Sequence, residues 1–287
     1  MSDQIIESVA DFLNKVTEFR KHWKVEKDKE LWFRGEGQDF GETKLTPKLY
    51  RPKKGESLRP VTELLKIEKD LSDEFSRLGT QLCEPQIEPE YEDWDWYFLM
   101  QHHGAVTRLL DWTDGALVAL HFASRPREPD GNFRFVYVLA PDQLQDRIKG
   151  MPDVKITEQK WKEFAESDSY YKYKGVESEW EYAYLPANEE ELAKVDLPNV
   201  PLLLEFSHIT RRIAAQRSRL IVFGRDPRWL LDRITNSSFP METFKFAGES
   251  VQSIRRELRD CGMTESVIYP DLDGLGRQMD QRFNEQK

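Results

Sequence analysis

An almost wholly apolar segment, residues 116–123, most constrains how this 287-residue chain can fold. Its sequence, Ala-Leu-Val-Ala-Leu-His-Phe-Ala, would cover most of the circumference of a helix with apolar groups, so we expect a central helix here. Thr113 or Asp114 is expected to cap its start. Gln-His-His-Gly at residues 101–104 begins a dense polar stretch just before this helix. That stretch continues with Thr107, Arg108 and Asp111.

Residues 31–37, Leu-Trp-Phe-Arg-Gly-Glu-Gly, predict a short buried strand that ends in a tight turn, because bulky strand formers precede two glycines. Alternation predicts a second strand at 133–139. We expect further extended segments at 106–110, 201–206 and 219–224, the last of these being the last strong strand. Residues 266–275 predict a strand, a proline stop and a terminal helix.

Apolar residues spaced three and four apart predict helices that cover the sheet. The first is expected at residues 5–19, with Ser2 or Asp3 as its cap. The others are expected at 61–82, 93–100, 208–216 and 251–258. This pattern favours an α+β fold with a central mixed, mostly antiparallel sheet and packed helices.

Composition indicates a globular chain, since 39% of the residues are hydrophobic and 33% charged. We expect one domain over residues 1–287, with a core at about 25–275. Residues 142–200 are polar, with scattered tyrosines, and predict an insertion. It is either a peripheral lobe or a substrate-facing flap, and the sequence does not choose between them.

The formal net charge of −10 argues against nucleic acid as a bulk electrostatic partner, because that mode of binding needs a basic face. No stretch approaches the roughly 18 apolar residues of a membrane span, and no secretory signal is expected. Cys83 and Cys261 are expected to be buried free thiols. We therefore predict a cytoplasmic protein.

Arg34 stands where the first strand ends, beside Gly35, which would let a ligand approach the backbone. It is either an anion contact or half of a structural ion pair. Arg51 is either a second anion contact or a surface residue. Arg108 and Asp111, three residues apart, either serve a site or pair with each other.

His102 and His103 are adjacent, so we expect one to contact a ligand and the other a backbone carbonyl. A metal site is disfavoured, because the remaining histidines do not fall at ligand spacing. Gly-x-Ser-x-Gly, kinase and P-loop patterns do not occur. Arginines, neutral imidazoles and amides remain, and these suit an anionic small molecule such as a dinucleotide.

Three ordered blocks resemble the FRG domain family, named after its Phe-Arg-Gly triplet. They are Phe33-Arg34-Gly35, Leu45-Thr46-Pro47 with Arg51, and the stretch from Gln101 to Trp112. Arg212-Ile213-Ala214-Ala215-Gln216 resembles a later element of the family, but Arg217-Ser218-Arg219-Leu220 departs from its usual Gly-x-Phe. The resemblance implies a protein of conflict between phage and host, either a toxin or a defence effector.

The order of these elements is also similar to that of the NAD-binding elements of ADP-ribosyltransferases. That similarity implies NAD as cofactor, with Arg34 and Gly35 as its anchor. It implies further cofactor contacts from Arg51, Gln101, His102, Thr107, Arg108 and Asp111, and catalytic roles for His103 and Gln216. The alternative function is a non-catalytic module that recognises a ligand or a protein partner.

Overall fold

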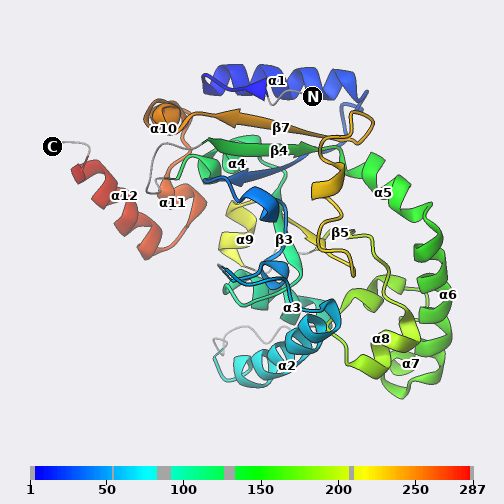
Figure 1. Cartoon of the computed structure of the whole chain (residues 1–287). Coiled ribbons are helices and arrows are strands. Elements are labelled where there is room, and N and C mark those ends of the chain that lie inside the picture. The colour runs from blue at the N-terminus through cyan, green and yellow to red at the C-terminus, as the bar shows by residue number, and fades with distance from the viewer. Residues whose placement is uncertain (1–3, 54, 83–91, 126–132, 207–209, 285–287) are drawn as a thin grey trace.

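The computed structural model describes residues 4–53, 55–82, 92–125, 133–206 and 210–284. Its centre is a seven-stranded sheet with the strand order β1-β7-β4-β2-β3-β6-β5 (Figure 1). The strands are β1 (Gln4–Ile5), β2 (Trp32–Glu36), β3 (Leu109–Thr113), β4 (Arg134–Leu139), β5 (Leu202–Leu204), β6 (Ser218–Val222) and β7 (Met241–Phe246). Only the β1–β7 pair is parallel among these strands. The predicted α+β fold with a mixed, mostly antiparallel sheet is confirmed.

Helices cover both faces of the sheet. They are α1 (Val9–His22), α2 (Val61–Gly79), α3 (Asp93–His102), α4 (Ala116–Ala123), α5 (Pro141–Lys149), α6 (Pro152–Ser167), α7 (Ser169–Lys174), α8 (Glu189–Val195), α9 (Arg211–Ala215), α10 (Val251–Asp260), α11 (Glu265–Ile268) and α12 (Leu272–Asn284). Helices α1, α4 and α10 share one apolar cluster with alternate residues of β2, β4 and β7. Helices α2, α3, α5, α6 and α8 contribute to the larger cluster, which holds the other residues of β2 and β4.

Helix α4 lies directly against β2 because position 35 has no side chain. A Cβ atom on Gly35 would stand 1.9 Å from the carbonyl oxygen of Ala119 and 2.7 Å from the amide nitrogen of Ala123. Phe33, two residues earlier on the strand, is buried and packs edge-to-face against Phe12 of α1. The apolar helix predicted from the sequence is therefore central, as expected.

The starts of two predicted helices are corrected by the structure. Residues Gln4–Ile5 form β1, which pairs with β7, and helix α1 begins only at Val9, where the Ser8 side chain accepts from the amide of Asp11. The proposed caps Ser2 and Asp3 lie outside the described residues. Helix α4 is preceded by Gly115 at its N-cap, because Thr113 is still part of β3 and its hydroxyl accepts from the Gly115 amide.

Other corrections concern strands. The extended segment expected at 106–110 forms β3 three residues later, at Leu109–Thr113. Strand β6 is not the last strand, because β7 follows it and pairs with β4 over six residues. Residues 265–268 form helix α11 rather than a strand, since the amide of Ile268 donates to the Thr264 carbonyl and the Ile268 side chain is buried beside Val118.

The segment predicted as an insertion contains helices α5 to α8, which Figure 1 shows as a green arc beside β5. Several of its aromatic residues pack together: Trp161 and Tyr182 stack with their ring centroids 6.0 Å apart, and Trp161 donates to the Val176 carbonyl. These residues belong to the larger apolar cluster. The single-domain boundaries and the choice between lobe and flap stay predictions.

Cys261 is a free thiol, but it is exposed rather than buried, because it follows the last turn of α10; Cys83 lies outside the described residues. Within the described part of the chain, no helix has the length and apolar character to cross a membrane.

We predict that Gly35→Ala severely destabilises the fold, because the added methyl group would clash with the backbone of α4. The expected loss in free energy of unfolding is about 3 kcal/mol or more. Gly37→Ala is the matched control, since a Cβ there would meet backbone oxygens only at 3.4 Å. Urea unfolding of both variants measures the difference, and equal stabilities would contradict the close approach of α4.

Candidate functional site

A cleft of about 460 Å³ opens where β2 and β3 separate. The two strands are joined in register by a single residue pair, Phe33 with Thr113, whereas β2 and β4 are paired over five residues. Residues of both strands beyond that pair line the cleft, together with the ends of α3, α4 and α9. The predicted site residues that it brings together are Arg34, Gly35, Arg51, Gln101, His102, Asp111 and Gln216.

Arg34 bridges the gap between the two strands. Its Nη1 donates to the Asp111 carbonyl oxygen at 2.7 Å, and its Nε donates to Glu36 Oε1 at 3.1 Å. Glu36 is buried and also accepts from the Tyr137 hydroxyl. The structural ion pair predicted as one role of Arg34 is thus present. Arg34 also lines the cleft, and its role as an anion contact stays a prediction.

Asp111 places a carboxylate in the cleft and has an oriented side chain. Gln101 Nε2 donates to Asp111 Oδ2 at 2.8 Å, and the Thr107 hydroxyl donates to Gln101 Oε1. The side chain faces the open cleft, yet the surrounding protein raises the pKa of its carboxyl by desolvation, against the opposing effects of Arg34 and the Gln101 hydrogen bond. Thr107 is fully buried, so it positions Gln101 rather than contacting a ligand.

The two histidines lie in different surroundings, and the prediction that one contacts a ligand and the other a backbone carbonyl stays a prediction. His102 lines the cleft, and burial, followed by the charges of Arg212 and His103, lowers its pKa to about 4. The imidazole of His102 is therefore neutral at pH 7. His103 is exposed outside the cleft lining, with its ring 6.5 Å from that of Phe75. The implied catalytic role of His103 is thus not supported by its position.

Arg51 and Gln216 also line the cleft. Arg51 stacks on Phe40 at 4.5 Å and donates to the Thr46 carbonyl. Gln216 follows α9, where its side chain donates to the Ile268 carbonyl at 3.3 Å and its own carbonyl accepts from the Thr113 hydroxyl. Gln216 thus joins the end of β3 to the C-terminal segment.

Arg108 is a correction to the predicted set of cofactor contacts. Its side chain is wholly buried and its Nε donates to Glu68 Oε2 of α2 at 2.5 Å, while Nη1 and Nη2 donate to the carbonyls of Phe223 and Tyr184. It does not pair with Asp111, and it does not line the cleft. Arg108 forms a structural ion pair, as the alternative prediction had it, but its partner is Glu68 rather than Asp111.

Sequence reasoning missed several lining residues: Glu36, Lys48, Arg125, Arg212 and Tyr269. Glu36 could have been predicted, because it lies two residues after Arg34 and residues two apart on a strand face the same side. Arg212 could also have been predicted, since it precedes the candidate site residue Gln216 by four residues, and residues at this spacing on a helix are neighbours. No local signal marks Arg125 or Tyr269, which come together only in the fold.

The cleft is basic although the chain is acidic. Among the described residues, five cationic side chains and two carboxylates line it, in a chain of formal charge −10. Aromatic rings also contribute to its walls, among them Phe98, whose ring centroid lies 4.4 Å from that of Phe206. Within the described ranges, no three metal-ligating side chains gather. Such a cleft suits an anion that carries a flat ring.

The FRG domain family matches residues 29–131, so the chain contains an FRG domain. The match includes β2, β3 and α4 and therefore one wall of the cleft, whereas α9 and α11 lie beyond it. No curated protein and no solved structure matches the chain.

We predict that Glu68→Gln strongly destabilises the protein, because it leaves the Arg108 guanidinium buried without its counter-charge. The expected loss is about 3–5 kcal/mol in free energy of unfolding. Glu63→Gln on the same helix is the control; it disrupts the exposed Arg59–Glu63 pair and should cost about 0.5 kcal/mol or less. Chemical denaturation compares the two, and a small loss for Glu68→Gln would contradict the role of the buried pair.

We also predict a pH dependence from His102. Because its pKa is lowered to about 4 in the folded state, the unfolded state binds its proton first as pH falls. This group therefore subtracts stability as pH falls from about 6.5 to about 4. The difference in stability between wild type and His102→Gln should change over this window and be constant above pH 7. A difference that does not vary with pH would show that the imidazole is not desolvated.

Proposed function

We propose that the cleft binds NAD and that the protein is an ADP-ribosyltransferase-like enzyme. The observation that carries this proposal is the excess of cations over carboxylates in a cleft of an acidic chain. Electrostatic complementarity of this kind favours a polyanion such as a dinucleotide. The aromatic rings at the walls offer stacking surfaces for its bases.

The carboxylates give the cleft its proposed chemistry. In a transfer from NAD, the ribose would exchange its bond to nicotinamide for a bond to an acceptor nucleophile. Nicotinamide would leave as a neutral molecule with the electron pair, and the acceptor would give up a proton. Positive charge would develop on the ribose as the first bond lengthens. A carboxylate held against that position stabilises the charge, as in glycoside hydrolysis. Asp111 fits this role, because its carboxyl faces the cleft and Gln101 fixes one oxygen. Glu36 is held by Arg34 and Tyr137 and orients Arg34 instead.

A second candidate function is non-catalytic recognition of the same class of ligand. The closed network of Arg34 with Glu36 and the Asp111 carbonyl favours it, because such a network can hold a cleft in shape without chemistry. In either case we propose that the protein acts in conflict between phage and host. An active enzyme would be a toxin or a defence effector there, and a module would be a sensor.

Calorimetry with NAD tests binding, and chromatography of the NAD pool tests its consumption. We expect heat of binding for the wild type and at least about tenfold weaker binding for Arg34→Ala, which loses the bridge between β2 and β3 and one cation of the cleft. Arg59→Ala, at an exposed position on the N-terminal side of α2, is the control. No heat at millimolar NAD would end the proposal, and binding with NAD left intact would favour the recognition module.

We predict that Asp111→Asn abolishes NAD consumption without loss of stability. The raised pKa means that ionised Asp111 opposes folding at neutral pH, so the amide should leave the melting temperature unchanged or higher at pH 7. This gain should vanish below about pH 3.8, where the carboxyl is protonated in both states. Asp73→Asn, on the surface of α2, is the control. Full activity of Asp111→Asn would exclude the carboxylate from the reaction.

A further inference from the structure

We propose that Arg212 and Arg125 form a phosphate subsite beside Tyr269 at the C-terminal wall of the cleft. This inference rests on the proposed use of the cleft for a nucleotide and adds where its phosphates bind. All three residues line the cleft, and they come from three distant segments: α9, the residues after α4, and the end of α11.

The Arg212 guanidinium has a donor group without a hydrogen-bond partner among the described residues. Its guanidinium carbon lies 4.7 Å from the centre of the Tyr269 ring, and that contact leaves the edge of the guanidinium available. Its Nε is buried, and within the described residues it has no hydrogen-bond partner. No ion pair joins Arg212 to a carboxylate of the described chain. A buried N–H without an acceptor costs free energy, and an anion in the cleft would remove that cost.

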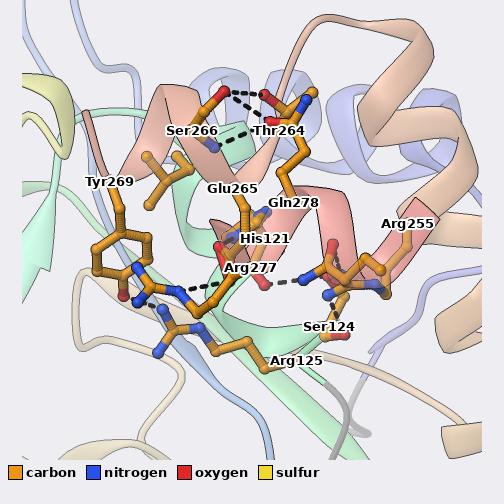
Figure 2. Close-up of polar contacts among 12 residues, drawn as sticks. His121, Ser124, Arg125, Arg255, Thr264, Glu265, Ser266, Tyr269, Arg277 and Gln278 are labelled. Carbon is orange, nitrogen blue, oxygen red and sulfur yellow. Dashed lines mark hydrogen bonds and ion pairs between the residues drawn. The ribbon is translucent and has the colours of Figure 1, made fainter. Parts of the chain in front are cut away.

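Three arginine side chains lie around the Tyr269 ring, and Arg212 is one of them. The guanidinium carbons of Arg125 and Arg277 lie 5.0 and 4.7 Å from the centre of the same Tyr269 ring. Figure 2 shows Arg125 at the Tyr269 hydroxyl, to which it donates, and Arg277 beside Glu265, at 4.0 Å. Glu265 also contacts His121 at 3.2 Å. His121 and Arg277, the groups that Glu265 contacts most closely, do not line the cleft.

The pKa of His102 responds to the positive charge at this wall. After burial, the charge of Arg212 is the largest cause that lowers the pKa of His102. An anion bound to Arg212 would screen that charge from the imidazole. The guanidinium fork of arginine matches phosphate oxygens in geometry as well as charge, so phosphate is the ligand class that this wall favours.

The test uses inorganic pyrophosphate, ADP and NAD as probes, with calorimetry for affinity and NMR for the pKa of His102. We expect pyrophosphate to bind the wild type and to raise the pKa of His102. Arg212→Gln should weaken pyrophosphate and ADP by about tenfold or more, which is typical of a charge-assisted contact. Arg212→Lys should be intermediate. Arg211→Gln, the exposed neighbour on α9, is the matched control and should bind as the wild type does.

The outcomes separate this inference from the proposed function. Pyrophosphate that neither binds the wild type nor shifts His102 overturns the subsite, and this result needs no variant to fold. Equal affinity in Arg212→Gln and Arg211→Gln also overturns it, even where NAD is consumed. Pyrophosphate and ADP binding that depends on Arg212, with NAD left unbound, supports the subsite and overturns the proposed function.

Discussion

The fold depends on one buried ion pair, Arg108 with Glu68. Arg108 begins the approach to β3, and its side chain reaches helix α2, the residue after β6 and the carbonyl of Tyr184 in the segment between α7 and α8. Glu68 also accepts from the Arg108 amide and from the Tyr97 hydroxyl of α3. Desolvation of both charges is costly, so the pair is stable in the interior only because nearly every polar atom of the two side chains forms a hydrogen bond. It thereby fixes α3, and with it Gln101 and His102, relative to β3.

The Phe-Arg-Gly triplet has a geometric explanation. Phe33 and Gly35 face the same side of β2, where Phe33 fills the core beside α1 and Gly35 admits the backbone of α4. Arg34 faces the other side and bridges to Asp111. One strand thus seats the central helix and spans the opening between β2 and β3. The same alternation that buries Phe33 puts Arg34 and Glu36 in the cleft.

Periodicity was sufficient to predict the sheet class, the strand at β2 and the helix at α4, because those patterns are local. It could not distinguish Arg34, which lies within β2, from Arg108, which directly precedes β3, since the contacts that separate their roles involve residues elsewhere in the chain. The partner of Arg108, Glu68, belongs to a helix 40 residues earlier. His102 and His103 differ likewise only through the helix end that turns one ring outward. Strand β7 was missed because its alternation is weak, with only Met241, Phe244 and Phe246 buried.

Charge is distributed unevenly along the cleft, and this suggests an orientation for a dinucleotide under the proposed function. Glu36 and Asp111 stand near Arg34, so the β2–β3 end is close to neutral. Arg125 and Arg212 lie against the Tyr269 ring at the C-terminal wall, where Glu265 contacts His121 and lies near Arg277. The nicotinamide ring of NAD is cationic and its pyrophosphate is anionic. The ring therefore belongs beside Asp111 and the phosphates beside Arg212, which assigns Arg34 to bridging the strands rather than to gripping the pyrophosphate.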